Sequence, residues 1–279
     1  MQTINCKGTL IDLVRPRVMG IINVTPDSFY DGGVTTLEHQ IIKQASQMLD
    51  QGATILDVGG YSSRPGATDI SEEQEIDRVI PAIKAIIEAY PKALISIDSF
   101  RSNVVKQAVK AGACIANDIS AGKLDPKMIE TIGDLQIPYC MMHMRGTPQT
   151  MKSLTDYKNI TKEVLFYFSE RVAAARAHNI NDIIIDPGFG FAKTTHQNFE
   201  LLNHLELFES LDIPLLAGVS RKSMVYKTLD ITPKQALNGT TALHMVALQK
   251  GARILRVHDV QPAIECIKLF EQLDKPVSN

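Results

Sequence analysis

The sequence has little of what marks nucleic-acid-binding, membrane or secreted proteins. It contains no tryptophan, and its formal net charge is −2 with no long run of one sign. Such a balance gives no support for a nucleic-acid partner or a polybasic contact with a membrane. No apolar run approaches the ~20 residues that span a bilayer, and the first residues lack a signal-peptide pattern. We therefore expect a soluble, cytoplasmic protein.

Cysteines are also few, and their spacing excludes the common cysteine-based sites. Cys6, Cys114, Cys140 and Cys266 lie far apart and form no Cys-x-x-Cys pair. Cys114 and Cys140 fall inside apolar runs, which predicts reduced core residues. No group of histidines and cysteines has the spacing of a zinc site.

What the sequence does contain is a repeated unit: a short apolar run, a polar residue, a loop and a helical pattern. We count eight such runs, and each is nearly all apolar, which is typical of parallel strands covered on both faces. The predicted strands are residues 18–22, 54–58, 94–97, 114–116, 138–142, 182–185, 214–217 and 253–257.

Eight such units in 279 residues favour an α/β fold of the (β/α)8 TIM-barrel class, as a single domain over residues 1–279. An open, doubly wound sheet is the alternative. Gly20 and Gly32-Gly33 lack the G-x-G-x-x-G spacing, so a dinucleotide-binding fold has weak support. Residues 2–14 predict a short N-terminal hairpin with Lys7-Gly8 as its turn, which would plug one end of the barrel.

Local signals place several helix ends. Residues 71–74 have the form of a capping box, and Gly112 is expected to stop the helix at 101–111. Asp125-Pro126 predicts a short helix with proline at its first position. Longer helical patterns cover residues 37–49, 156–178, 196–211, 233–250 and 260–273.

The polar residues after the eight strands are the candidate functional residues. One polar residue at a strand end is weak evidence, but barrel strands present all their carboxyl ends at one face, where barrel enzymes have their active sites. The set is Asn23, Asp57, Asp98, Asn117, His143, Asp186, the 220–223 loop, and Arg256 with His258.

Two kinds of ligand suit these residue types. Asp98, Asn117, Asp186 and Lys222 offer the acceptors and donors that would surround a flat, nitrogen-rich heterocycle. A second set suits an anion such as a diphosphate with its Mg²⁺, because it combines cations with a hard amide oxygen. That set is Asn23, Ser63, Arg64, Arg256 and His258.

Two glycine-rich loops follow strands and could close over a ligand. Residues 59–66 have glycines at both ends, as expected of a lid, although a plain surface loop fits the same pattern. Residues 186–193 carry Phe189 and Phe191, either of which could stack on a planar substrate or close the top of the core.

Taken together, these segments resemble the dihydropteroate synthases. The resemblance runs in the family's order from about residue 18 to 260. It rests on NVTPDSF at 23–29, DVGGYSSRPG at 57–66, SIDS at 96–99, NDI at 117–119, DPGFGF at 186–191, SRKS at 220–223 and RVH at 256–258.

The resemblance implies a transferase of folate biosynthesis that joins 6-hydroxymethyl-7,8-dihydropterin diphosphate to p-aminobenzoate, with sulfonamides as competitors and a homodimeric assembly. It implies that Asp57, Asp98, Asn117, Met144, Asp186 and Lys222 bind the pterin, and that Asn23 binds Mg²⁺. Ser63, Arg64, Arg256 and His258 would bind diphosphate, and Phe191, Lys222 and Ser223 would frame p-aminobenzoate. Asp98, Lys222 and Arg256 are the expected catalytic residues.

Two positions depart from the form of this loop that is expected to be commonest in the family, Glu-Ser-Thr-Arg: this chain has Tyr61 in place of the carboxylate and Ser63 in place of the threonine. Ser63 keeps the hydroxyl, so its expected role toward the anion is retained. Tyr61 replaces a carboxylate, so we assign no role to Tyr61 from the sequence.

Two other functions remain as alternatives: a methyltetrahydrofolate-binding methyltransferase domain and a non-catalytic pterin-binding paralogue. A methyltransferase domain would need no diphosphate site, so Arg256, His258 and the 220–223 loop argue against it. A non-catalytic paralogue would be expected to have lost Asn23, Lys222, Arg256 or His258, and all four are present.

Overall fold

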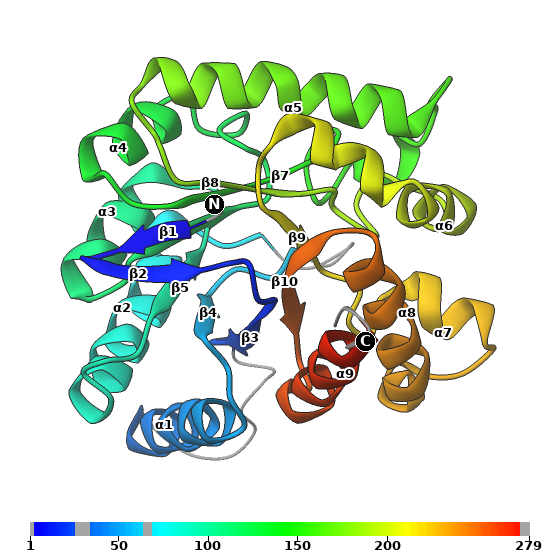
Figure 1. Cartoon of the computed structure of the whole chain (residues 1–279). Coiled ribbons are helices and arrows are strands. Elements are labelled where there is room, and N and C mark those ends of the chain that lie inside the picture. Colours follow the sequence, from blue (N-terminus) through cyan, green and yellow to red (C-terminus); the bar gives the residue numbers. More distant parts are fainter. Residues whose placement is uncertain (1–2, 26–33, 64–68, 274–279) are drawn as a thin grey trace, which may run out of the picture.

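Eight parallel strands form a closed barrel in the computed structural model, which describes residues 3–25, 34–63 and 69–273 (Figure 1). Their order around the barrel is their order in the chain, and the last strand pairs with the first. The predicted TIM-barrel class is confirmed, and the open sheet is wrong. The strands are β3 (Arg17–Asn23), β4 (Ile55–Gly59), β5 (Ile95–Asp98), β6 (Ile115–Asp118), β7 (Tyr139–Met142), β8 (Ile183–Asp186), β9 (Leu215–Ala217) and β10 (Ala252–Val257).

Helices lie outside the strands and cover them (Figure 1). Each buries an apolar face against the barrel; α2, for example, buries Val79, Ile83 and Ile86. The helices are α1 (Val34–Asp50), α2 (Glu72–Ala89), α3 (Ser102–Ala111), α4 (Met128–Leu135), α5 (Ile160–Ala177), α6 (Thr195–Asn203), α7 (Ser223–Thr228), α8 (Leu237–Gln249) and α9 (Val260–Leu273). Short 3₁₀ turns are η2 (Met151–Ser153), η3 (Leu205–Leu211) and η4 (Pro233–Gln235).

The predicted capping box at Ser71 is present, and Gly112 ends α3 with a φ of 132°. The prediction that Pro126 opens a helix is wrong, because α4 begins at Met128. The Asp125 carboxylate accepts hydrogen bonds from the backbone N–H groups of Lys127 and Ser102, at 2.9 and 2.7 Å. These bonds hold the chain in a turn before the helix.

Three predicted helices are shorter than expected. α5 begins at Ile160, where the Asn159 side chain caps it, rather than at 156. The stretch at 196–211 is two elements, α6 and η3, which meet at His204. The stretch at 233–250 is likewise η4 followed by α8.

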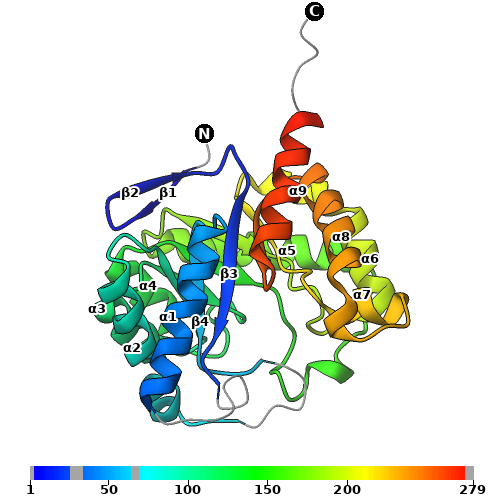
Figure 2. The same cartoon turned by 90° about the horizontal axis from the view of Figure 1, so that it is seen from below.

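A hairpin of β1 (Thr3–Cys6) and β2 (Thr9–Asp12) closes the barrel at the end where β3 begins (Figure 2). Lys7 and Gly8 form the turn of the hairpin. Both have positive φ angles, 50° and 83°, as a two-residue hairpin turn with a positive φ at each position requires. The hairpin buries four side chains against the bottom of the barrel interior, and this cluster confirms the predicted plug. Its members are Ile4, Cys6, Ile11, Leu13, Met19, Ile55, Cys114, Ile115, Cys140, Ile184, Leu216 and Ile254.

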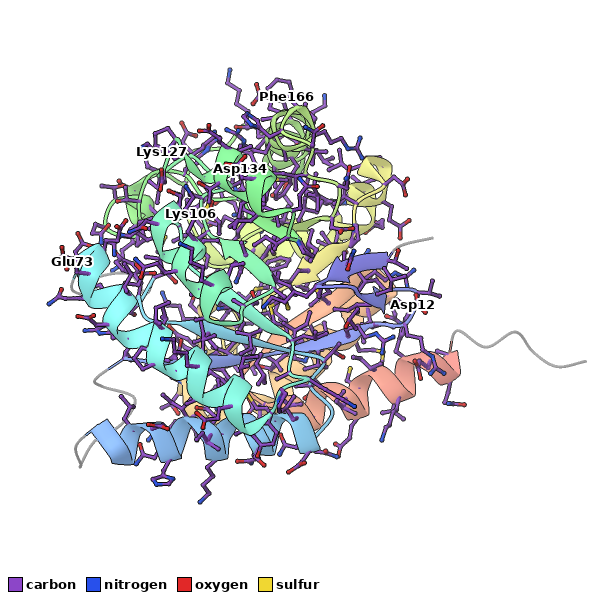
Figure 3. The ribbon with its side chains drawn as sticks, turned by 90° about the vertical axis from the view of Figure 1, so that its left-hand side faces the viewer. Asp12, Glu73, Lys106, Lys127, Asp134 and Phe166 are labelled. Carbon is purple, nitrogen blue, oxygen red and sulfur yellow. The ribbon has the colours of Figure 1, made fainter. Side chains whose placement is uncertain are left out.

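Charged side chains such as Glu73, Lys106 and Lys127 point outward from the helical ring (Figure 3). All four cysteines are buried and free, as predicted for Cys114 and Cys140. Within residues 3–25, 34–63 and 69–273, no helix is both long and apolar enough to cross a bilayer.

Candidate active site

The carboxyl ends of neighbouring strands bring the predicted residues into register. Asp98 on β5 lies between Gly59 of β4 and Asn117 of β6, and Gly59 in turn pairs with Asn23 of β3. This edge is the one opposite the hairpin. The predicted strand-end residues therefore gather at one open end of the barrel, as the fold requires.

Arg256 is the centre of this group. Its Nε donates to Asp57 Oδ2 and its terminal nitrogen donates to Asp98 Oδ2, each at 2.6 Å. Asn117 Nδ2 also donates to Asp57 Oδ2, at 3.0 Å. The sequence placed Arg256 with the anion-binding residues and Asp98 with the heterocycle-binding ones, whereas the structure joins them in one network.

Asp57 lies inside β4 rather than just beyond it, and it is 0% exposed. Its Oδ2 accepts two hydrogen bonds, but its Oδ1 is buried with no hydrogen-bond partner among the residues that the structure describes. An unpaired buried carboxylate oxygen is costly, on the order of 1–3 kcal/mol or more. A ligand that brings an N–H group to this oxygen would remove that cost.

The charges around Asp98 set its protonation. Burial raises the pKa of the Asp98 carboxyl to about 7; the charges of Asp57 and Glu75 raise it too, while Arg256 opposes them. Burial works against the charge of Arg256, but the Asp57 and Asp98 carboxylates raise its pKa above the usual value. Arg256 is therefore a permanent cation beside an aspartate that titrates near neutral pH.

A second group lies at the end of β8 and on the loops after β8 and β9. Asp186 Oδ1 accepts a hydrogen bond from the Gly188 backbone at 2.8 Å, and burial raises the pKa of Asp186 while Lys222 opposes this. Lys222 Nζ lies 4.4 Å from the centre of the Phe191 ring. Ser223 follows Lys222 as the first residue of α7. A cation and an aromatic face thus lie together at this end of the barrel.

Apolar side chains form a wall beside this group. Met144 and Phe191 belong to one buried cluster, which joins the loop after β7 to the loop after β8. Its other members are Ile119, Met142, Met151 and Ala192, with Phe100 and Leu124 packed against it. The wall gives the polar site a dry side against which a planar ring can pack.

The sequence analysis did not identify Lys193, which is buried beneath the loop after β8. Its Nζ contacts Gly188 O at 2.9 Å, Phe191 O at 3.0 Å and His143 Nδ1 at 3.0 Å. Burial lowers the pKa of Lys193 to about 7, and burial also keeps the pKa of His143 well below its usual value. Lys193 therefore ties the backbone of Phe191 to the end of β7.

Arg221 is another residue whose role only the structure reveals. Its guanidinium makes a bidentate ion pair with Asp259 at 2.7 and 2.8 Å and donates to the backbone oxygens of Pro233 and Lys234. Asp259 follows His258, whose Nδ1 lies 3.1 Å from Ser220 Oγ. These contacts fix the loop after β9 to the loop after β10.

The residues predicted to hold an anion and Mg²⁺ are only partly described. Asn23 and Ser63 are half-buried at the open end, and His258 is exposed there. Arg64 lies outside the described residues. Among those that are described, no three Asp, Glu, His or Cys side chains are grouped so as to hold a metal ion. An amide oxygen such as that of Asn23 fits Mg²⁺ here only if water and a phosphate-bearing substrate complete its shell, which is a usual arrangement for this ion.

The chain is similar to known pterin-binding proteins over nearly its whole length. Residues 19–258 match the family described as pterin binding enzyme. The dihydropteroate synthase of Escherichia coli K12 is 42% identical over 267 residues, covering 95% of this chain and 94% of the relative. Two solved structures, from Yersinia pestis with a sulfonamide drug and from Xanthomonas albilineans with 4-aminobenzoic acid, each superpose with a TM-score of 0.91. Both are 38% identical and cover 98% of this chain and 99% of theirs.

Proposed function

This chain belongs to the dihydropteroate synthase family of pterin-binding enzymes and is a transferase, and we propose that it joins 6-hydroxymethyl-7,8-dihydropterin diphosphate to p-aminobenzoate. The products would be 7,8-dihydropteroate and diphosphate. The observation that carries the proposal is the network in which Arg256 joins Asp57 and Asp98, beside the Lys222–Phe191 pair.

We assign five residues to pterin binding: Asp57, Asp98, Asn117, Asp186 and Lys222. The unpaired Oδ1 of Asp57 would accept from a ring or exocyclic N–H group, and Asn117 is already oriented by Asp57. Lys222 would donate to a ring nitrogen or carbonyl oxygen. Met144 would pack against a face of the ring from the apolar wall.

The bond to be broken joins a methylene carbon to a diphosphate oxygen. Arg256 and His258, with Ser63 and Arg64, would stabilise the negative charge that develops on the leaving group. Mg²⁺, when held at Asn23, would supply further charge neutralisation of the diphosphate. Asp98 would stabilise the positive charge that develops on the pterin methylene, so the path is dissociative and SN1-like.

p-Aminobenzoate would lie between Phe191, Lys222 and Ser223. The ring of Phe191 offers an apolar face, and Lys222 reaches both that face and the pterin side of the site. The arylamine would then attack the methylene carbon without a covalent enzyme intermediate. A sulfonamide drug bound to the Yersinia pestis relative supports the expectation that sulfonamides compete at this position.

The decisive experiment measures diphosphate release and dihydropteroate formation by the purified protein. Reactions contain the pterin diphosphate with and without Mg²⁺ and p-aminobenzoate, beside an Arg256→Ala variant. We expect Mg²⁺-dependent release, a product that requires p-aminobenzoate, and collapse of both in the variant. Pterin binding without any release would contradict the proposal and return the chain to the non-catalytic alternative.

The dissociative path has its own test. Release of diphosphate from the pterin substrate alone, slow but dependent on Asp98, is the expected result. Strict dependence of release on p-aminobenzoate, with kinetics of a single displacement, would contradict it.

The relatives reported above are synthases, which is why the methyltransferase alternative is not retained. The expected homodimer stays part of the proposal. Large exposed apolar side chains in the last third of the chain, Leu229 and Leu269, are compatible with contacts between late helices. Light scattering of the purified protein tests this, and a monomer at micromolar concentration would contradict it.

A further inference from the structure

The loop between β4 and α2 is held at both of its ends by one residue, Arg101. We propose that Arg101, Tyr61, Phe100 and Gln149 form a loop clasp, whose task is to position Ser63 for the diphosphate of the substrate. The inference rests on the proposed function for the identity of that anion. It gives Tyr61, which the sequence left without a role, a positioning role.

Tyr61 anchors the first end of the loop. Its side chain is only 8% exposed, and its ring packs edge-on against Phe100, with centroids 5.1 Å apart and an interplanar angle of 86°. Its hydroxyl accepts a hydrogen bond from Gln149 Nε2 at 2.8 Å. Gln149 belongs to the loop after β7, so this bond ties together two loops that are 88 positions apart.

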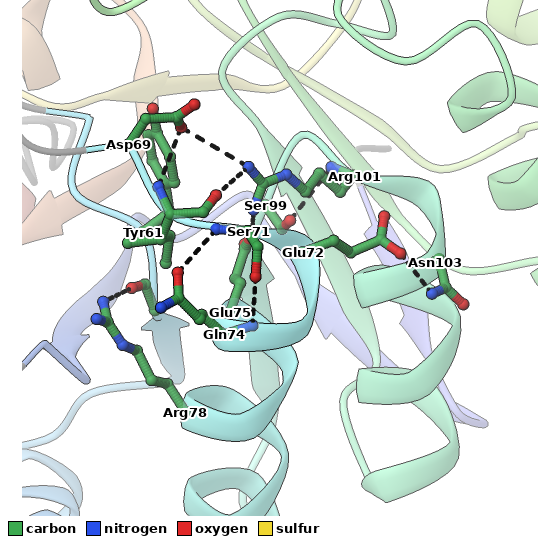
Figure 4. A network of polar contacts seen from close by, with 12 residues as sticks. Tyr61, Asp69, Ser71, Glu72, Gln74, Glu75, Arg78, Ser99, Arg101 and Asn103 are labelled. Atoms are coloured by element: carbon green, nitrogen blue, oxygen red, sulfur yellow. Dashed lines mark hydrogen bonds and ion pairs between the residues drawn. The ribbon is translucent and has the colours of Figure 1, made fainter.

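Arg101 anchors the second end of the loop (Figure 4). One terminal nitrogen donates to Ile70 O at 2.6 Å and lies 3.8 Å from Asp69 Oδ1. The guanidinium carbon is also 5.4 Å from the centre of the Tyr61 ring, within the range of a cation–π contact. A single guanidinium therefore contacts residues 61 and 70, the two ends of the loop.

The clasp is fixed to the rigid part of the fold. Arg101 pairs with the buried Glu75 of α2 at 2.7 Å, and its backbone N–H donates to Ser99 Oγ at 3.2 Å. Ser99 directly follows Asp98 of β5. Arg101, which is anchored next to the strand of Asp98, therefore contacts Tyr61 and Ile70, the described residues on either side of Ser63 in the sequence.

Tyr61 stands where the family resemblance implies a carboxylate, and its contacts show which interactions it makes instead. A carboxylate at this position would offer Arg101 a charge and hydrogen-bond acceptors, but no ring surface. The tyrosine instead offers a ring face to Arg101, a ring edge to Phe100 and a hydroxyl to Gln149. Burial is the main reason that the pKa of Tyr61 is raised, so its hydroxyl stays protonated near neutral pH.

The test compares binding of inorganic diphosphate, with Mg²⁺ present, and of 6-hydroxymethylpterin, which lacks diphosphate, by calorimetry. Variants are Tyr61→Ala, Tyr61→Phe and Gln149→Leu. The matched control is Asn103→Ala, because Asn103 bonds Glu72 at 2.7 Å in the same network but contacts neither end of the loop. Steady-state KM and kcat values accompany the binding data.

We expect Tyr61→Ala to weaken diphosphate binding about tenfold and to raise KM for the pterin diphosphate similarly, with pterin binding unchanged. Tyr61→Phe and Gln149→Leu should each weaken diphosphate binding about two- to threefold. The double variant Tyr61→Phe/Gln149→Leu should weaken it no more than either single change, because both changes remove the same hydrogen bond. Asn103→Ala should match the wild type.

Equal losses for diphosphate and pterin, or no loss of diphosphate binding in the folded Tyr61→Phe and Gln149→Leu proteins, would overturn the clasp. Normal turnover with such results would leave the proposed function standing. A wild-type protein that binds both ligands but forms no dihydropteroate would refute the proposed function instead, and selective loss of diphosphate binding in the variants would still support the clasp.

Discussion

The two ends of the barrel interior differ completely, although the same strands build both. At the end closed by the hairpin, Ile55, Ile115, Ile184 and Ile254 point into a dry apolar cluster. Two residues further along the same strands stand Asp57, Asn117, Asp186 and Arg256. Side chains two apart face the same side of a strand, so one step of about 7 Å separates the apolar packing from the charged site.

This contrast shows that stability and chemistry are divided between the ends. Substitutions at the hairpin end should change unfolding and spare turnover, whereas substitutions at the open end should do the reverse. The predictions below test that division, starting with the largest expected effect.

Arg256→Met should abolish turnover, lowering kcat/KM by ~10³-fold or more, because it removes the cation that joins Asp57 and Asp98 and would stabilise the leaving group. The control is Arg253→Met on the same strand, whose guanidinium donates to Val14 O at the other end of the barrel. Steady-state kinetics of both variants provide the measurement. Comparable activity in the two would show that the ends are not functionally distinct.

Leu13→Ala should destabilise the fold by ~2–5 kcal/mol while kcat/KM stays near the wild-type value, because it leaves a cavity in the apolar cluster under the hairpin. Leu10→Ala is the matched control, since Leu10 is on the same hairpin but 71% exposed. Urea unfolding measures the difference. A large loss of activity in folded Leu13→Ala would mean that the hairpin also shapes the open end.

The raised pKa of Asp98, about 7, predicts a pH dependence of kcat/KM that originates from a residue at the open end of the barrel. Below this pKa the carboxyl is protonated and neutral, so it no longer stabilises the developing cation. We expect kcat/KM to fall about tenfold per pH unit below pH 7 and to level off above it. Asp98→Asn should give a low profile without that step, and an unchanged step in this variant would exclude Asp98 as its source.

Lys193→Met should have the smallest effect, a roughly threefold to tenfold rise in KM for p-aminobenzoate with little change in KM for the pterin substrate. The reason is that Lys193 donates a hydrogen bond to the carbonyl oxygen of Phe191, whereas among the residues assigned to the pterin it interacts with Asp186 through charge. Lys106→Met, on the exposed face of α3, serves as the control. Equal changes in both KM values would point to a general loosening of the site.

The architecture could be predicted from the sequence because parallel barrel strands are buried on both faces and appear as continuous apolar runs. The positions where helices begin and end were harder to predict from the sequence. α7 has six residues and no apolar period long enough to detect, and Asp125 bonds the backbone where a proline rule placed a helix start. The hairpin could be predicted because a glycine, at Gly8, lies between two short runs of strand-forming residues.

The convergence of the strand-end residues at one end of the barrel could be predicted, but their pairing could not. Arg256 and Asp57 are 199 positions apart, and no local pattern links them. Lys193 was missed because a lysine is usually exposed, and its burial depends on carbonyls that only the folded loop brings together. Tyr61 was noticed only as a departure, because its partners come from two other loops.

The pairing of β10 with β3 has a consequence for how the protein is made. A ribosome releases the chain from its amino end, so Asp57 and Asp98 emerge long before the strand that carries Arg256. Until that strand arrives, the nascent chain exposes an open-sided sheet with two acidic groups and no cation between them. Termination before about residue 256 therefore yields a product without activity and with unpaired strand edges, which is a natural substrate for chaperones and proteases.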